Sequence, residues 1–144
     1  MKSFGPPEKV YVENEWYDGP RLGVADVNGV PHRFKSLFDE EEDEYLSTYL
    51  VWPIEDQYLE LEIEQWNIFV KWNSMYESGT VGADSHPGHG GIDKRYDEIQ
   101  SYLMASRDTL PPTAKRAKAK FEHNDTVTRY SSSGPGYSLR WRLL

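Results

Sequence analysis

The sequence predicts a single α+β domain, in which an antiparallel sheet of about four to five strands is covered by two main helices. Three observations lead to this fold class. Segments rich in β-formers occupy the first third of the chain, two segments of helical periodicity follow, and a strongly alternating segment ends it. The 144 residues suit one domain. We expect residues 1–9 to form a flexible tail, because Gly5-Pro6-Pro7 blocks regular structure, and residues 10–144 to form the domain.

The first strands are predicted on either side of a tight turn. Residues 10–17 are rich in β-formers and indicate a strand. Residues 21–27 and 30–34 flank Asn28-Gly29, two residues that tolerate positive φ and therefore suit a type I′ hairpin turn. This hairpin is the clearest local feature of the chain.

An acidic run separates the hairpin from the next segment. Residues 39–44 are six consecutive acids, which favour a solvated loop or the first turn of a helix. Residues 45–54 follow, and their Tyr, Thr, Val and Trp content favours a strand that ends at Pro53. A short helix begun by the acids is the alternative.

Residues 55–77 show the strongest helical periodicity. One apolar stripe holds Leu59, Ile63, Trp66 and Val70, and a second stripe beside it holds Leu61, Ile68, Trp72 and Met75. We expect Trp66 to lie in the core. Because the apolar arc is wide, the helix is either central to the core or also packs on a partner, and Trp72, Met75 and Tyr76 are the candidate interface.

A glycine-rich loop at residues 78–91 leads into the second helix. Residues 92–107 have helical periodicity, and Asp93 is placed to cap the helix or lie in its first turn. The expected buried face of this helix holds Ile92, Tyr96, Ile99 and Leu103.

The last third is predicted to return to the sheet. Residues 114–123 are interpreted as a short basic helical segment, and residues 126–136 as a loop. Residues 137–144 alternate between apolar and basic side chains, which indicates a terminal strand. That strand must pair with an earlier strand, most simply residues 10–17 or 45–54, and so closes the domain end to end.

Composition excludes several classes of function. The chain has no cysteine, so disulfides, thiolate catalysis and cysteine-ligated metal sites are ruled out. Its aromatic content of 14% is too high for a disordered chain. The net charge of −8 repels phosphate backbones, so we expect no general nucleic-acid binding, although a local basic patch can override the total. With no apolar stretch of membrane-spanning length, we expect a soluble cytoplasmic protein that does not bind membranes.

The histidines of the glycine-rich loop are the only conspicuous chemical feature. His86 and His89 can approach one divalent metal ion, with Asp84, Asp93 or a distant carboxylate as a third ligand. The favoured interpretation is structural: the glycines permit the turn and the imidazoles bond to local polar groups. We therefore expect no cofactor, with a divalent metal as the alternative.

The start of the second helix is a candidate anion site. Gly90 and Gly91 precede the helix, where free backbone N–H groups attract anions, and Lys94 and Arg95 add positive charge. No strand leads into these glycines, so the nucleotide-binding fingerprint is absent.

Two functions from different classes follow. The favoured one is a protein-binding or accessory module that uses an aromatic-rich helix or sheet face, with a protein partner or a second copy of the chain. The alternative is a small enzyme or a ligand- or metal-binding protein that uses the His86/His89 loop. An enzyme is the less favoured, because no Gly-x-Ser-x-Gly motif or other catalytic motif is present.

Overall fold

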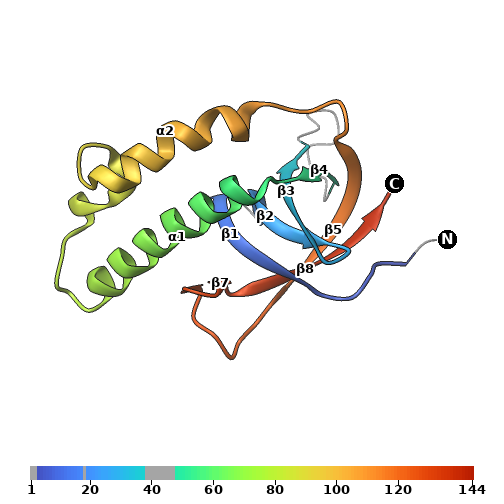
Figure 1. Cartoon of the computed structure of the whole chain (residues 1–144). Helices are drawn as coiled ribbons and strands as arrows, with labels where there is room; N and C mark the ends of the chain where they lie inside the picture. Colours follow the sequence, from blue (N-terminus) through green and yellow to red (C-terminus); the bar gives the residue numbers. More distant parts are fainter. Residues whose placement is uncertain (1–2, 18, 38–47) are drawn as a thin grey trace.

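Antiparallel strands close into a barrel from which a helical hairpin projects (Figure 1). The structure is a computed structural model that describes residues 3–17, 19–37 and 48–144. Around the barrel the strand order is β1-β2-β3-β4-β5-β8. The strands are β1 (Glu8–Trp16), β2 (Pro20–Val27), β3 (Val30–Ser36), β4 (Thr48–Pro53), β5 (Lys115–His123) and β8 (Tyr137–Leu143).

The helices lie between β4 and β5 in the sequence. They are α1 (Asp56–Glu77) and α2 (Lys94–Asp108), and two short 3-10 turns, η1 (Ala83–Ser85) and η2 (Pro87–His89), join them. The predicted loop at 126–136 contains a small ladder of β6 (Tyr130–Ser131) and β7 (Gly134–Pro135). No helix of the described residues is long and apolar enough to cross a membrane.

The C-terminal strand closes the barrel, as the alternation of its side chains predicts. β8 pairs with β5 along its whole length and with the start of β1 through Glu8 and Lys9. The Asn28-Gly29 hairpin is also confirmed, with φ of 54° at Asn28 and 77° at Gly29. Residues 48–53 form β4, which confirms the strand over that part of the predicted range.

The barrel interior forms one hydrophobic core. Phe34, Tyr49 and Trp141 meet there with ring centroids 5.7 to 6.0 Å apart. The polar groups of Tyr49 and Trp141 make hydrogen bonds: the Tyr49 hydroxyl donates to the Pro20 carbonyl at 2.6 Å, and the Trp141 indole N–H donates to the Asp26 carbonyl at 2.9 Å. The other buried members are Val10, Ala25, Val27, Val51, Ala117, Ala119, Tyr137 and Leu139.

A second core lies outside the barrel, under α1. Trp66 is buried against Val12 of β1 and Val24 of β2, which confirms it as a core residue. The rest of the first apolar stripe, Leu59, Ile63 and Val70, packs on the same cluster. On α2, Ile99 and Leu103 are buried as predicted, whereas Ile92 precedes the helix and is exposed.

Three expectations differ from the structure. Among the described residues the antiparallel sheet closes into a barrel of six strands, whereas the sequence predicts a sheet of about four to five strands. Residues 115–123 form strand β5, so the predicted basic helix is wrong: Ala117 and Ala119 alternate into the barrel, and this period of two is a strand pattern that their helix propensity obscured. β1 also begins within the segment predicted as a tail. The acidic run 39–44 lies outside the described residues.

Candidate functional site

A buried carboxylate attaches the helical hairpin to the barrel. The Glu62 side chain on α1 is completely buried and accepts hydrogen bonds from two guanidinium groups. Arg33 of β3 donates through Nη1 at 2.5 Å, and Arg107 of α2 donates through Nη2 at 2.6 Å and Nε at 3.0 Å. Asn14 of β1 adds a fourth donor at 3.1 Å. One carboxylate therefore connects β1, β3, α1 and α2.

This arrangement keeps Glu62 ionised. Burial alone would raise the pKa of its carboxyl group, but hydrogen bonds and positive charge from Arg107 and Arg33 outweigh burial and hold the pKa below its ordinary value. Burial, with a smaller contribution from the charge of Arg107, lowers the pKa of Arg33, although the Glu62 carboxylate acts in the opposite direction. Arg107 is further held by the side-chain oxygens of Gln65 at 2.7 Å and Gln100 at 3.1 Å. The network contains two cations and one anion.

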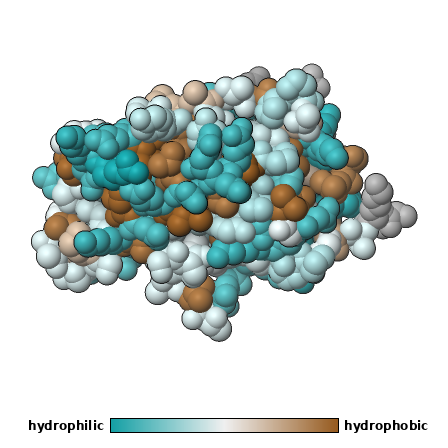
Figure 2. Space-filling model, viewed as in Figure 1, coloured by the Kyte–Doolittle hydropathy of each residue, from teal (hydrophilic) through white to brown (hydrophobic). Residues whose placement is uncertain are grey.

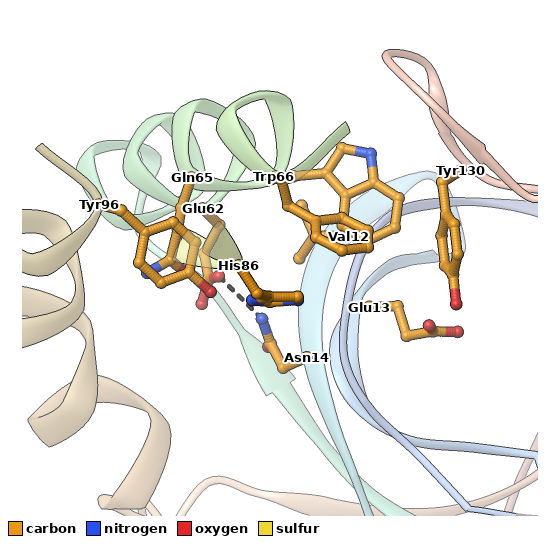
Figure 3. A pocket seen from close by; sticks show the side chains of 10 residues that line it. Val12, Glu13, Asn14, Glu62, Gln65, Trp66, His86, Tyr96 and Tyr130 are labelled. Atoms are coloured by element: carbon orange, nitrogen blue, oxygen red, sulfur yellow. Dashed lines mark hydrogen bonds between the residues drawn. The ribbon is translucent and has the colours of Figure 1, made fainter. Parts of the chain in front are cut away.

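A cavity of about 200 Å³ lies beside this network, between α1, β1 and the loop that precedes α2 (Figure 3). Part of its wall is aromatic: the rings of Trp66, Phe69 and Tyr130 contact one another at centroid distances of 5.0 to 6.0 Å. The indole of Trp66 is fixed by its N–H, which donates to the Ser131 carbonyl at 2.7 Å. The complete lining is Val12, Glu13, Asn14, Glu62, Gln65, Trp66, Phe69, His86, Tyr96 and Tyr130.

His86 enters the cavity from the glycine-rich loop. Its Nδ1 accepts a hydrogen bond from the Gly88 amide at 2.8 Å, so the neutral ring carries its proton on Nε2. The ring lies 4.5 Å from that of Trp72 and 5.5 Å from that of Phe69. Burial, and to a lesser extent the nearby His89, lowers the pKa of His86. Near pH 7 it is therefore a hydrogen-bond donor.

Glu13 lies on the opposite side of the cavity, and its negative charge is balanced by Arg129. One of its oxygens, Oε1, accepts from Arg129 at 2.7 Å and from the Tyr137 hydroxyl at 2.9 Å. Burial, with the charge and hydrogen bond of Glu13, raises the pKa of Tyr137 far above its ordinary value, so this hydroxyl remains protonated. The guanidinium of Arg129 also lies over the rings of Trp16 and Tyr130, at 4.6 and 4.7 Å from their centroids.

Several polar atoms of the lining have no hydrogen-bond partner among the described residues. The hydroxyl of Tyr96 is directed toward His86 and Asn14, and that of Tyr130 toward Glu13 (Figure 3). Asn14 Oδ1 is buried without a partner. His86 Nε2 and Glu13 Oε2 likewise make no hydrogen bond to a described residue. The cavity is therefore surrounded by uncommitted donors and acceptors, that is, polar atoms available to bond a ligand.

The carboxylates and the imidazole of the lining already make hydrogen bonds or ion pairs within the chain. Both carboxylates are ion-paired, and the imidazole holds its proton on the nitrogen that does not face Gly88. No family model matches the chain, and neither a curated protein nor a solved structure matches it. The interpretation of this site therefore rests on its own geometry.

The structure brings His86 and His89 together, but as stacked rings. Their centroids lie 5.3 Å apart with an interplanar angle of 26°. Asp93 is the N-cap of α2, where its side chain accepts from the Tyr96 amide at 2.8 Å, and Asp84 is exposed in η1. Within the described ranges, no group of three or more His, Asp or Glu side chains is arranged to hold a metal ion.

Two of the four residues of the predicted anion site, Gly91 and Arg95, bond to carboxylates of the chain itself. The Gly91 amide donates to Asp97 at 2.9 Å. Arg95 makes a bidentate ion pair with Glu64, at 2.6 and 2.8 Å, and lies 3.5 Å from Glu98. Gly90 has a φ of 80° and Lys94 is exposed at the start of α2.

The predicted interface residues pack partly within the chain. The indole of Trp72 donates to the Ser85 hydroxyl at 2.8 Å, and its ring stacks on Tyr76 at a centroid distance of 5.1 Å. Met75 is half-buried, while Tyr76 keeps 41% of its surface exposed.

The sequence does not predict most of the residues that line the cavity. The lining residues that it does not indicate as a site are Glu13, Asn14, Glu62, Gln65, Tyr96 and Tyr130. One signal was present. Glu62 lies three residues after Leu59 and four before Trp66, so helical periodicity places it among the apolar residues of the first stripe. A charged residue at such a position must be paired when it is buried, although the sequence does not show with what.

Replacement of Glu62 should be far more damaging than replacement of its neighbour Glu64. Glu62→Gln leaves two partly or fully buried guanidinium groups without their anion, and should lower the free energy of unfolding by about 3–5 kcal/mol. Glu64→Gln removes an exposed pair with Arg95 on the same helix and should change little. Urea unfolding of both variants measures the difference. Equal stabilities would contradict the role assigned to Glu62.

His86 should make the protein less stable in mild acid. Its pKa is lowered on folding, so the unfolded chain binds the extra proton more readily, and stability falls as the pH drops through about 6.5. The paired Glu62 carboxyl adds its own loss only below about pH 4.5. His86→Asn keeps an acceptor for the Gly88 amide but cannot titrate.

Thermal melts at pH 7.5 and pH 5.0 test this effect. The melting temperature of the wild type should fall more than that of His86→Asn, while His123→Asn, which replaces an exposed histidine outside the cavity, should behave as the wild type. The same pH dependence in wild type and His86→Asn would refute it.

Proposed function

We propose that the protein binds a small, neutral, ring-shaped polar molecule in the cavity beside Glu62. The observation that carries this proposal is the set of uncommitted polar atoms on His86, Tyr96, Tyr130, Glu13 and Asn14 around one aromatic-walled space. Concave sites with apolar walls and a few convergent polar groups are the usual form of ligand pockets. The proposal develops the alternative drawn from the sequence, a ligand site that uses the His86 loop.

Size and charge narrow the class of ligand. At about 200 Å³ the cavity is smaller than the 300–1,000 Å³ or so that drug-sized ligands occupy, which favours a molecule of a single ring. The two carboxylates of the lining are already paired with Arg33, Arg107 and Arg129. None of these arginines lines the cavity, so a ligand with a net charge would meet no unpaired opposite charge in the lining. A planar ring can pack on Trp66 and Phe69 while its polar edge meets the hydroxyls.

Binding, rather than catalysis, is the function favoured by these groups. A general base requires a free group whose pKa lies near the operating pH. Glu62 is fully paired with a lowered pKa, Glu13 is paired, and the tautomer of His86 presents a donor. The ligand would exchange its hydrogen bonds with water for those of the cavity.

Nicotinamide, uracil, cytosine and N-acetylglucosamine are suitable first probes, tested by saturation-transfer NMR and titration of tryptophan fluorescence. We expect at least one planar probe to bind with a Kd near ~0.1–1 mM, or about −4 to −5.5 kcal/mol. Tyr96→Phe and Tyr130→Phe each delete one uncommitted hydroxyl, and should weaken that binding by about 2- to 10-fold.

Tyr102→Phe is the matched control, because Tyr102 is also on α2 but is 66% exposed and does not line the cavity. It should bind as the wild type does. Absence of binding by every probe, or equal affinities in all three tyrosine variants, would contradict the proposal.

A protein-binding function is the second candidate, and exposed apolar residues on the helical hairpin favour it. Tyr76, Ile92, Tyr102 and Met104 each expose 41% or more of their surface. Apolar side chains gather over the helical part of the molecule in the view of Figure 2, with hydrophilic side chains around them. Exposed apolar side chains on the helices suit a docking surface for another protein or a second copy of the chain.

A further inference from the structure

A second cavity, of about 440 Å³, lies where α1 begins and α2 ends, at the barrel side of the helical hairpin (Figure 1). Arg33 and Trp52 of the barrel, Tyr58 of α1 and Ser106 of α2 are among the residues that line it, and it is called the Arg33 cavity below. It shares no lining residue with the cavity beside Glu62. Its volume is within the range of about 300–1,000 Å³ that ligand pockets occupy.

Arg33 reaches this cavity because of the strand register. Arg33 and Trp52 pair directly across β3 and β4, and their neighbours Phe34 and Val51 belong to the barrel core. Since side chains alternate along a strand, Arg33 and Trp52 lie together on the outer face of the barrel. They are nevertheless buried, with 1% and 6% of their surface exposed. The register thus sets a buried cation beside an apolar ring in the wall of the cavity.

One nitrogen of the buried guanidinium has no hydrogen-bond partner. Nη1 of Arg33 donates to Glu62, and Nε donates to the Ser106 hydroxyl at 3.1 Å, but Nη2 makes no hydrogen bond to a described residue. Nε–H and Nη2 share one edge of the planar guanidinium, so Nη2 is directed to the same side as Ser106, which lines the cavity. A buried donor without an acceptor is destabilising, and a bound ligand can supply the acceptor.

Two hydroxyl groups of the lining can donate beside Nη2. The Ser106 hydroxyl accepts from Arg33, so its own proton is available to a ligand. Tyr58 lies near enough to Arg33 to influence the pKa of its guanidinium, and the Tyr58 hydroxyl makes no hydrogen bond to a described residue. The Arg33 cavity therefore combines three available donors, which is the arrangement that binds an oxyanion.

The network behind these donors has one positive charge in excess. Arg33 and Arg107 share the single carboxylate of Glu62, and Arg107 bonds to both of its oxygens whereas Arg33 bonds to one. The excess charge is therefore at Arg33. The one acid among the lining residues is Glu55, whose side chain is exposed and makes no capping hydrogen bond. Water screens this exposed acid far more than it screens the buried excess charge.

We propose that the Arg33 cavity binds a monocarboxylate with an apolar body, a function separate from that of the cavity beside Glu62. The carboxylate would accept hydrogen bonds from Arg33 Nη2 and from the hydroxyls of Ser106 and Tyr58. The apolar body would pack on the ring of Trp52. A single negative charge matches the excess charge of the network, whereas a neutral ligand would leave it uncompensated. The second charge of a phosphate monoester would be repelled by Glu55.

Three benzene derivatives of similar shape test the charge of the ligand. They are benzoate, the neutral benzamide, and phenyl phosphate, which carries nearly two negative charges at pH 7.5. Titrations followed through the backbone amide shifts of residues 52–58 and 105–113 report this cavity separately from the first one. We expect benzoate to bind with a Kd near ~1 mM. Benzamide should bind at least about 10-fold more weakly, because it accepts weaker hydrogen bonds than an anion does.

Arg33→Gln removes the excess charge, while Arg107 remains paired with Glu62. It should weaken benzoate binding at least about 10-fold and change benzamide binding less than about 2-fold, so a loss of selectivity reports the role of Arg33. Tyr58→Phe deletes one donor and should weaken benzoate binding about 10-fold. Tyr102→Phe is its matched control, because Tyr102 is exposed and lies outside the cavity.

A change at the edge of the cavity tests the charge without altering the network. Glu55→Gln should strengthen benzoate binding about 2-fold, and phenyl phosphate binding by more, because the repelling charge is removed. Glu60→Gln removes an exposed acid of the same helix outside the cavity and should leave both affinities unchanged. If Arg33→Gln does not fold, these two variants and Tyr58→Phe carry the test.

Four results would overturn the proposal. The first is the absence of amide shifts in residues 52–58 and 105–113 at about 20 mM benzoate. The second is equal affinity for benzoate and benzamide, and the third is tighter binding of phenyl phosphate than of benzoate. The fourth is a preference for benzoate over benzamide that neither Arg33→Gln nor Tyr58→Phe reduces.

Discussion

The position of the helical hairpin depends on one buried carboxylate. Glu62 accepts hydrogen bonds from two guanidinium groups and an amide that come from β3, α2 and β1, and its own backbone belongs to α1. The buried Arg33 and the partly buried Arg107 would be highly unfavourable close together without this anion, and the buried anion would be unfavourable without them. The network can form only when all four elements are in place, so it specifies the angle and register at which the hairpin packs on the barrel, and with them the shape of the adjacent cavity.

Much of the fold could be predicted because local patterns and tertiary structure agree. Asn28-Gly29 requires a tight hairpin, the alternation at 137–144 requires a strand with one buried face, and the periodicity of α1 places Trp66 against β1 and β2. The closure of the barrel could not be predicted, because the alanines and lysines of β5 favour a helix. Ala117 and Ala119 are good helix formers with little hydrophobic surface, but in the barrel small side chains leave room for Tyr49 and Trp141. Without β5, the sheet lacked the strand that joins β4 to β8.

The candidate site could be predicted only in part. The sequence indicates His86 as a candidate, because a histidine in a glycine-rich loop can be recognised without knowledge of the tertiary structure. His86 does line the cavity. It did not indicate Glu13, Asn14 or Tyr130, which come from β1 and β6 and approach α1 only through tertiary packing. The Arg33 cavity could not be predicted for the same reason. Arg33 and Ser106 are 73 residues apart in the sequence, and they meet only when α2 packs on the barrel.

Hydrogen exchange of the Glu62→Gln variant, followed residue by residue by NMR, tests most directly whether this carboxylate holds the hairpin on the barrel. Amides of α2 should lose protection through local opening, while those of β2, β3 and β8 should remain protected until global unfolding. Uniform loss of protection in barrel and helices would show that Glu62 supports the whole fold without a specific role in docking. Unchanged protection of α2 would show that apolar packing alone holds the hairpin, and would contradict the account.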